Sequence, residues 1–282
     1  MAQALVITGG ASGFGLAVAN CCAARGFDVA LLDREADRVG EAAAQVRDAH
    51  GVRALGIAAD VSSTASIEDA ARIVAAAFGR CDLLWANVGV QHFGAVEAIT
   101  DDEWRWVLDV NVVGTVRTVR CFLPLLRASD NARLAITSSA NALAPAARLG
   151  AYQASKYAVV GLAETLRIEL VADAIGVSVV YPSGMITRHL ESSAAARPNA
   201  AARPNALGTA NDFTENLMAM MASRPMTERD LATAEDAAAN AVTGVLAGEP
   251  HVITHGDLKS LVDNSHAAIS DALARVGERQ NR

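Results

Sequence analysis

Alternating strand-like and helix-like segments predict a single α/β domain, in which a doubly wound parallel sheet is covered by helices on both faces, a three-layer α/β/α arrangement. The chain has 282 residues, of which 52% are hydrophobic, and this suits one large domain with a sizeable core. The first apolar run, 4–8, leads at once into a glycine-rich turn and a helical pattern. We therefore expect one domain over 1–282, with its site at the carboxyl ends of the strands.

The first half of the chain supplies four expected strands. Each is a short run rich in Val, Leu, Ile or Ala and bounded by polar or turn residues, as in strands that are buried on both faces. The segments between them carry apolar residues at helical spacing. The expected strands are 4–8, 27–32, 53–59 and 83–86, and the expected helices run through 16–22, 34–50 and 66–78.

The second half of the chain continues the alternation, with one long helical region that is expected to break. Asn111 lies amid apolar residues of the region 102–126, and an Asn is unfavourable inside a helix unless it bonds something. Right-handed crossovers then complete a Rossmann-type sheet. The remaining expected strands are 134–137, 177–181 and 251–254, and the remaining helices are 152–174 and 235–247.

The glycine-rich turn after the first strand predicts a site for the pyrophosphate of a dinucleotide. Glycines let the backbone approach a phosphate closely, and the start of the following helix offers free N–H groups and a partial positive charge. The spacing is Thr-Gly-x-x-x-Gly-x-Gly rather than Gly-x-Gly-x-x-Gly. The residues expected to contact the cofactor here are Gly9, Ser12, Gly13, Phe14 and Gly15.

Asp33 and Arg34 bear on which dinucleotide is bound. Asp33 ends the second expected strand, eighteen residues after Gly15. A carboxylate there accepts hydrogen bonds from both ribose hydroxyls of NAD and repels the 2′-phosphate of NADP. Arg34 is a basic neighbour that can hold such a phosphate. We expect both residues to contact the cofactor and favour NAD over NADP; the alternative for Asp33 is that it only begins the next helix.

Tyr152 and Lys156 predict acid/base chemistry on an alcohol or a carbonyl. Because they are four residues apart on an expected helix, their side chains share one face. A nearby ammonium stabilises a phenolate, so we expect it to lower the pKa of Tyr152 from its ordinary value of about 10. The hydroxyl of Ser139 would hydrogen-bond the substrate oxygen beside Tyr152. A nucleophilic Ser is disfavoured, because no Gly-x-Ser-x-Gly elbow surrounds Ser139.

The glycine spacing and the distant Tyr-x-x-x-Lys pair together resemble the classical short-chain dehydrogenase/reductase family, over about 5–254. The resemblance implies an NAD(P)-dependent oxidoreductase that interconverts a secondary alcohol and a ketone. Tyr152 would be its general acid/base, Lys156 would also hold the nicotinamide ribose, and Ser139, at the family's spacing from Tyr152, would orient the substrate oxygen. Asn111 matches the family's catalytic Asn, which would hold a water that relays protons to Lys156; the alternative is a local kink.

Further cofactor contacts follow from the same resemblance. The family's Asp at the end of the third strand contacts adenine, its Asn-Asn-Ala-Gly segment approaches the ribose, and its Pro-Gly-x-x-x-Thr segment meets the nicotinamide amide. Ala86 replaces the first Asn of the second segment, and Ser183 replaces the Gly of the third. The residues expected on this basis are Asp60, Val61, Asn87, Gly89, Pro182, Met185 and Thr187, besides Tyr152 and Lys156.

Two other functions stay open from the sequence alone. One is a catalytically silent protein that senses NAD(H), although the complete set of Asn111, Ser139, Tyr152 and Lys156 speaks against it. The other is a nucleotide-sugar epimerase or dehydratase, although such relatives carry a larger C-terminal substrate region than this chain provides.

Residues 188–230 interrupt the alternation, and the resemblance implies that they close over the substrate as a mobile segment. The hexad Ala-Ala-Arg-Pro-Asn-Ala occurs twice in succession over 195–206, and its prolines and small residues favour a loop. The apolar residues that follow at helical spacing are either ordinary core or a face that adapts to a mainly apolar substrate: Phe213, Leu217, Met218, Met220 and Met221. The expected substrate contacts near the motifs are Gln91, His92, Asn141 and Leu149.

Composition and charge limit the partners. The net charge of −7 and the pI of about 5.4 argue against nucleic acid or an acidic membrane surface, and no apolar run is long enough to span a bilayer. The cysteines show no metal spacing and are expected to be reduced thiols of a cytoplasmic protein. We expect a small-molecule alcohol or ketone as partner and no metal, because the histidines show no ligand-like grouping either: His92, His189, His251 and His255.

The resemblance also implies a homo-oligomer, either a tetramer or a dimer, packed through helices 158–170 and 102–126. The segment 257–282 has an amphipathic helical pattern beyond the expected last strand. We expect this tail to pack on a neighbouring subunit or on its own surface, and the sequence leaves both open.

Overall fold

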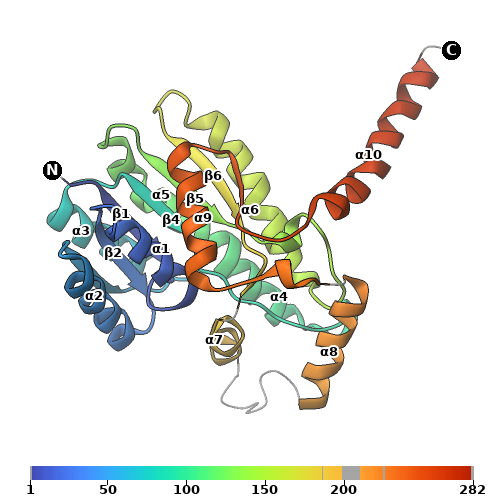
Figure 1. Cartoon of the computed structure of the whole chain (residues 1–282), viewed down its shortest axis with the longest axis horizontal. Helices are drawn as coiled ribbons and strands as arrows, with labels where there is room; N and C mark the ends of the chain where they lie inside the picture. Colours follow the sequence, from blue (N-terminus) through green and yellow to red (C-terminus); the bar gives the residue numbers. More distant parts are fainter. Residues whose placement is uncertain (1, 186, 199–209, 225, 281–282) are drawn as a thin grey trace.

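The structure, a computed structural model, describes residues 2–185, 187–198, 210–224 and 226–280. Within these residues, seven strands form one parallel sheet in the order β3-β2-β1-β4-β5-β6-β9 (Figure 1). The direction of winding reverses between β1 and β4, so the topological switch point lies there. The strands are β1 (Ala4–Thr8), β2 (Asp28–Asp33), β3 (Ala54–Ala58), β4 (Leu83–Ala86), β5 (Arg133–Thr137), β6 (Gly176–Tyr181) and β9 (His251–Ile253).

Helices cover both faces of this sheet, because successive strand side chains point to opposite sides. Ala4 and Val6 of β1 pack in a core with α3, α5 and α6, whereas Leu5 and Ile7 pack in a second core with α1, α2 and α9. The predicted three-layer fold is therefore confirmed. The covering helices are α1 (Gly13–Ala23), α2 (Ala36–His50), α3 (Thr64–Phe78), α5 (Gly114–Arg127), α6 (Gly150–Glu169) and α9 (Ala234–Ala247).

The predicted break near Asn111 is confirmed, and it has a definite form. Helix α4 (Asp101–Leu108) passes into a π-helical segment, η2 (Asp109–Val113), before α5 begins. Asn111 lies in the middle of η2 and is buried. A π-helical turn adds a residue to the helix repeat. The Asn111 side chain is directed at Val90, in the loop after β4, and at Ser155 of α6.

Several shorter elements lie outside the alternation predicted from the sequence. The predicted helix 152–174 begins two residues earlier and ends at Glu169, where a turn replaces its last residues. The apolar residues that follow the tandem hexad at helical spacing fall on α8 (Ala210–Ser223). The elements that the sequence did not predict are η1 (Val96–Ala98), η3 (Ala140–Ala142), β7 (Gly184–Met185), α7 (His189–Ala196), η5 (Glu228–Asp230) and β8 (Leu231–Ala232).

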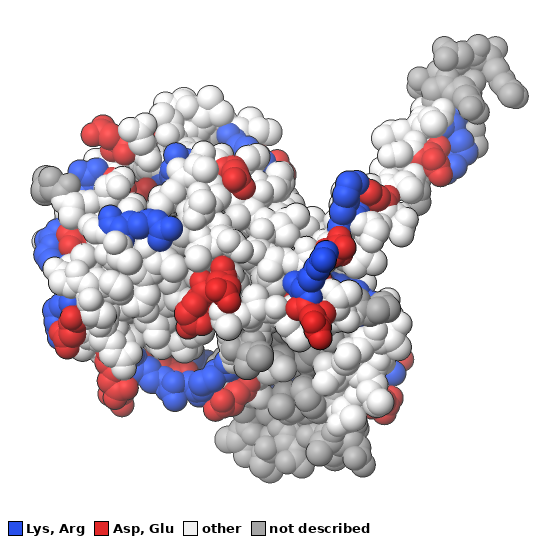
Figure 2. Space-filling model, viewed as in Figure 1, with Lys and Arg blue, Asp and Glu red and all other residues white. Residues whose placement is uncertain are grey.

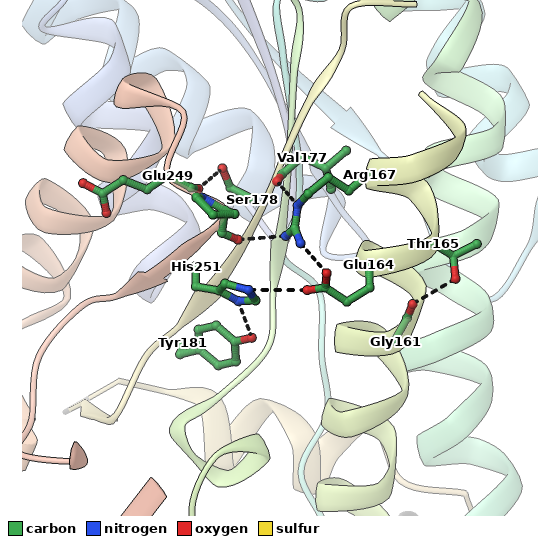
Figure 3. Close-up of polar contacts among 10 residues, drawn as sticks. Gly161, Glu164, Thr165, Arg167, Val177, Ser178, Tyr181, Glu249 and His251 are labelled. Carbon is green, nitrogen blue, oxygen red and sulfur yellow. Dashed lines mark hydrogen bonds and ion pairs between the residues drawn. The ribbon is translucent and has the colours of Figure 1, made fainter. Parts of the chain in front are cut away.

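A polar network fastens β9, at the edge of the sheet, to α6 (Figure 3). Arg167 donates from Nε to the carbonyl of Val177 at 3.2 Å and from Nη2 to the carbonyl of Pro250 at 3.0 Å. Glu164 pairs with Arg167 and lies 3.5 Å from Nε2 of His251. Because β9 is only three residues long, these side-chain contacts supplement its few ladder hydrogen bonds.

Replacing Arg167 by Met should lower the free energy of unfolding by about 1–3 kcal/mol, because two backbone carbonyls lose a charged donor. Urea unfolding followed by circular dichroism measures the loss. Arg105→Met is the matched control, since Arg105 is 71% exposed and its ion pairs with Asp101 and Asp102 are exposed as well. We expect the control to change stability by less than ~0.5 kcal/mol. Equal losses in the two variants would contradict a fastening role for Arg167.

The C-terminal helix α10 (Lys259–Gln280) extends away from the body of the molecule (Figure 1). Charged side chains of both signs lie along it (Figure 2). Ile269 and Leu273 are 61% and 68% exposed, so these two apolar residues do not pack on this chain, whereas Leu258 at the start of the tail is buried. Residues 281 and 282 of the tail lie outside the described residues. Within the described chain, no helix combines the length and apolar character needed to cross a membrane.

Candidate active site

A cavity of about 650 Å³ opens at the carboxyl ends of the strands. Parallel strands present these ends at one edge of the sheet, and the loops that follow them surround the cavity. The structure brings every residue expected to contact the cofactor to this one cavity. These residues are Gly9, Ser12, Gly13, Phe14, Gly15, Asp33, Arg34, Asp60, Val61, Asn87, Gly89, Tyr152, Lys156, Pro182, Met185 and Thr187.

The turn between β1 and α1 has the shape of a phosphate cradle. Gly9 and Gly13 adopt positive φ angles of 68° and 52°, which side chains disfavour. A Cβ on Gly15 would lie 2.1 Å from the carbonyl oxygen of Gly9, so the two backbone segments meet more closely than a side chain permits. The N-terminus of α1 begins here. This close backbone packing fits a dinucleotide pyrophosphate.

The carboxylate of Asp33 is held at the end of β2. Its oxygens accept hydrogen bonds from the N–H groups of Ala11 and Glu35, each at 3.2 Å. Both hydrogen bonds are long. The carboxylate, which lines the cavity, therefore keeps lone pairs that can accept further hydrogen bonds. The arrangement fits a ribose diol as ligand, and Arg34 lines the same end of the cavity.

Polar contacts at the ends of β4 and β5 replace those that Ala86 removes. The indole N–H of Trp85 donates to the hydroxyl of Thr137 at 3.0 Å, and that hydroxyl donates to the side-chain carbonyl of Asn87 at 3.0 Å. The hydroxyl of Thr8 accepts from the backbone N–H of Asn87 at 2.9 Å. The segment that carries Asn87 and Gly89 is therefore tied to three strands although the first Asn is missing.

Ser139, Tyr152 and Lys156 meet at the inner end of the cavity, and all three are buried. The hydroxyl of Ser139 faces that of Tyr152 closely enough to favour the phenolate form of Tyr152. The ammonium of Lys156 donates to the carbonyl of Thr137 at 3.0 Å and lies 5.7 Å from the centre of the Tyr152 ring. Ser138 instead donates to the carbonyl of Lys156 at 2.9 Å.

The prediction that Lys156 lowers the pKa of Tyr152 is wrong for this structure. Burial raises the pKa of Tyr152, and the hydrogen bond from Ser139 opposes the rise only in part. Burial also lowers the pKa of Lys156, to about 8. The physical reason is that both groups lie in a poorly solvated site, where each charged form is disfavoured, and that the ammonium is bonded to Thr137 rather than to the phenol oxygen.

The side chain of Asn111 makes three hydrogen bonds inside the protein. Its carbonyl accepts from the N–H of Val90 at 2.7 Å, and its amide donates to the carbonyl of Val90 and to the hydroxyl of Ser155, each at 2.9 Å. The hydroxyl of Ser155 in turn donates to the carbonyl of Tyr152 at 2.6 Å. Asn111 thus joins the loop after β4 to the turn of α6 that carries Tyr152.

Two of the four expected substrate contacts line the cavity, namely Gln91 and Asn141. Leu149 and His92 do not. Leu149 is fully buried, where it packs behind Tyr152. His92 is drawn into a buried cluster, with Nε2 3.4 Å from Glu103, which also pairs with Arg197. This cluster lies at a second, smaller cavity and connects α4 to the end of α7.

The segment 188–230 covers the cavity with α7 and α8. Leu217 and Met220 of α8 line the cavity, whereas Met218 and Met221 are 67% and 48% exposed, so the apolar stripe is divided between the two sides of the helix. Most of the tandem hexad, which is predicted to be a mobile loop, lies outside the described residues, at 199–206. The side chain of Phe213 lies outside them as well.

Among the cavity residues that the sequence analysis did not give as site residues are His189 and Arg224. His189 follows closely after Thr187, and its Nε2 is buried with no hydrogen-bond partner among the described residues. Burial, with a contribution from Lys156, lowers the pKa of His189 to about 4, so this ring is neutral at pH 7. Arg224 ends the helical pattern of 210–223 just before Pro225 and is buried at the cavity. A basic residue at the end of an apolar helix beside the site was the available signal.

No grouping of His, Cys, Asp or Glu in the described ranges could hold a metal ion.

Sequence comparisons agree with this geometry. A family model described as short chain dehydrogenase matches residues 3–198. D-beta-hydroxybutyrate dehydrogenase of Cupriavidus necator is 28% identical over 192 residues, which cover 68% of this chain and 74% of that enzyme. Two other curated relatives are matched over 58% and 63% of their own length, so the chain spans less than two thirds of each.

Solved structures with the same fold hold both forms of the cofactor. A short-chain dehydrogenase/reductase of Burkholderia phymatum in complex with NAD has a TM-score of 0.84 and 30% identity, over 95% of this chain and 94% of that one. L-sorbose reductase of Gluconobacter frateurii, complexed with NADPH and L-sorbose, has a TM-score of 0.75 and 25% identity, over 90% and 95%. Proteins similar to this chain therefore bind NAD in one case and NADPH in the other.

Proposed function

The chain belongs to the short-chain dehydrogenase/reductase family, and from that premise we propose that it interconverts a secondary alcohol and a ketone, with NAD as its preferred cofactor. One observation carries the proposal: a single cavity joins the glycine turn after β1 to the group formed by Ser139, Tyr152 and Lys156. The same cavity therefore has a place for a dinucleotide at one end and a proton donor at the other. Turnover by a Tyr152→Phe variant tests the proposal, as described in the Discussion.

The cradle residues would hold the cofactor at three points. The glycine turn and the N-terminus of α1 would receive the pyrophosphate, Asp33 the adenosine ribose, and Lys156 the nicotinamide ribose. When bound, the nicotinamide ring supplies or takes up the hydride.

Tyr152 is the proton donor in the direction of reduction. A substrate oxygen that accepts hydrogen bonds from the hydroxyls of Tyr152 and Ser139 has its developing negative charge stabilised by both. Because burial raises the pKa of Tyr152, the phenol is protonated at neutral pH and ready to give its proton. Lys156, with a pKa of about 8, is mostly charged at pH 7 and keeps a positive charge 5.7 Å from the centre of the Tyr152 ring.

Asn111 acts in this scheme as a positioning residue. Its bonds to Val90 and Ser155 set the turn of α6 on which Tyr152 lies. These contacts support a role in orientation, to which the proposed proton relay toward Lys156 would be added.

The preference for NAD rests on Asp33. Replacing Asp33 by Ala should weaken NADH binding by roughly 10- to 100-fold, because hydrogen bonds to a charged acceptor are lost. NADPH binding should stay equal or become tighter, since the charge that repels the 2′-phosphate is removed. Fluorescence titration with both cofactors measures the change.

The matched control is Asp37→Ala, because Asp37 is exposed in the first turn of α2 and does not line the cavity. This variant should bind both cofactors as the unmodified protein does. If the unmodified protein prefers NADPH, Arg34 overrides Asp33 and the cofactor assignment is wrong.

The substrate body is mainly apolar in this proposal. The side of the cavity near Tyr152 is lined by apolar side chains from several elements, which supports binding of a hydrophobic ketone or alcohol. These are Phe93, Trp106, Ala146, Leu217 and Met220.

A homo-oligomer is part of the proposal. The segment η2 and helices α5 and α6 carry exposed apolar side chains, and such surfaces favour association with a second copy. Val113, Val116, Tyr157 and Ile168 are 41%, 37%, 45% and 77% exposed. The projecting helix α10 would then contact a neighbouring subunit.

A further inference from the structure

Arg224 is a buried cation at the wall of the substrate side of the cavity. It lies just beyond α8, is 7% exposed and lines the cavity together with Asn141 and Met220. Placing a guanidinium in such a site is costly unless its charge is compensated, so the partners of Arg224 decide what the site is built to hold.

The protein satisfies only one side of this guanidinium. Nη1 donates to the side-chain carbonyl of Asn141 at 2.8 Å and to the backbone carbonyl of Ala144 at 3.2 Å, which uses both of its hydrogens. Nε and Nη2 have no hydrogen-bond partner among the residues that the structure describes. The free Nε–Nη2 edge has the fork geometry that binds a carboxylate through two parallel hydrogen bonds.

No carboxylate in the described part of the chain forms an ion pair with Arg224. Asp230 attracts it only through space, and one oxygen of Asp230 is already engaged, by the N–H of Thr227 at 2.7 Å and its hydroxyl at 2.9 Å. Burial lowers the pKa of Arg224 and Asp230 opposes this, but an arginine side chain stays protonated. The positive charge is thus buried beside the cavity with incomplete compensation.

A short chain of contacts links Arg224 to the reacting groups. Asn141, which accepts from Arg224, donates its backbone N–H to the hydroxyl of Ser139 at 3.2 Å. Ser139 in turn lines the cavity beside Tyr152 and acts on its hydroxyl. A substrate whose oxygen lies on Ser139 and Tyr152 therefore has Arg224 within reach of another part of the same molecule.

We propose that the free edge of Arg224 binds a carboxylate of the substrate, so that the enzyme acts on an oxo acid or hydroxy acid with an apolar body. This names the substrate class of the proposed function and rests on it. A single guanidinium suits a single negative charge. Of the other cations that line the cavity, Lys156 bonds Thr137, Arg188 pairs with Glu191, and Arg34 follows Asp33 at the end of β2.

Binding to the NADH-loaded enzyme tests the proposal without requiring turnover. Isothermal titration compares butanoate, hexanoate and octanoate with the amides of the same length. At least one acid should bind tighter than its amide. Arg224→Met should weaken binding of that acid by roughly 10- to 100-fold and leave the amide unchanged, and Arg224→Lys should restore part of the loss. Arg229→Met, an exposed arginine five residues further along the chain, is the matched control and should change neither ligand.

A purely structural role for Arg224 would weaken acid and amide together, and NADH affinity measured on each variant shows whether the fold is intact. Equal binding of acids and amides to the unmodified enzyme, or a parallel loss of both in Arg224→Met, overturns the proposal. The same titration on Tyr152→Phe should keep the preference for acids.

NADH consumption with 3-, 4- and 5-oxo acids and their methyl esters is measured separately. No reduction of any of these ketones counts against the proposed function, whereas reduction of the esters without preference for the acids counts against the carboxylate site.

Discussion

Tyr152→Phe should lower turnover by roughly 10²–10⁴-fold, the contribution expected of a positioned general acid. The ring of Tyr152 is buried at the cavity, and the substitution removes only the hydroxyl that faces Ser139. NADH binding should stay within about twofold of the unmodified protein, because the glycine turn and Asp33 are untouched. Steady-state assays with an accepted ketone and fluorescence titration with NADH measure the two effects.

Tyr157→Phe is the matched control for this variant. Tyr157 lies on the same helix, α6, but is 45% exposed and does not line the cavity. Loss of its hydroxyl should leave turnover unchanged. A Tyr152→Phe protein that keeps its turnover would sink the mechanism, whereas an unmodified protein that binds NADH and turns over no alcohol or ketone would favour the NAD(H)-sensing alternative.

Gly15→Ala should abolish tight cofactor binding, which is the second large effect that we expect. The added Cβ would be placed 2.1 Å from the carbonyl oxygen of Gly9 and 2.8 Å from the side-chain amide of Asn87. A Cβ atom does not approach other atoms this closely, so the turn must open. The backbone N–H groups proposed to bind the pyrophosphate would then be displaced from it. We expect NADH affinity to fall by roughly 100-fold or more, equivalent to about 2.7 kcal/mol.

Gly40→Ala separates this effect from a general cost of replacing glycine. Gly40 is exposed in the interior of α2, and nothing lies within 4 Å of the position that its Cβ would take. Alanine is the better helix former, so this variant should be stabilised by about 0.5–1 kcal/mol and bind NADH normally. Near-normal NADH affinity of Gly15→Ala would show that the turn does not hold the pyrophosphate.

The sequence could predict the fold and the gathering of the strand-end residues at one cavity, because both follow from local patterns and one topological rule. Gly9 and Asn87 come directly after an apolar strand and Asp33 is the last residue of one, and parallel pairing brings those strand ends to one edge. Nothing beyond strand type and order is needed to place them together. The break at Asn111 was predictable from a local pattern too, because a polar amide amid apolar residues is unfavourable in a regular helix.

The substrate end could not be predicted in the same way. His92 and Gln91 are neighbours in the sequence, yet only Gln91 lines the main cavity, because Glu103 of α4 holds His92 on the other side of the loop. Arg224 lies 68 residues beyond Lys156, and its burial depends on how α8 packs over the loop 140–146. Whether the pKa of Tyr152 is raised or lowered likewise depends on its burial. The four-residue spacing between Tyr152 and Lys156 gives no information about burial.

The π-helical segment η2 determines the rotational phase between α4 and α5. The buried positions 103, 107, 111, 115 and 119 recur every four residues. A regular α-helix repeats every 3.6 residues, so each such step drifts by about 40°, and five positions in a row would wind about 160° around the axis. One added residue in a π turn takes up about 100° of that drift. A deletion of one residue within 109–113 is therefore equivalent to turning the whole of α5 on its axis. The number of residues in this segment, rather than their type, therefore determines which face of α5 packs against the sheet.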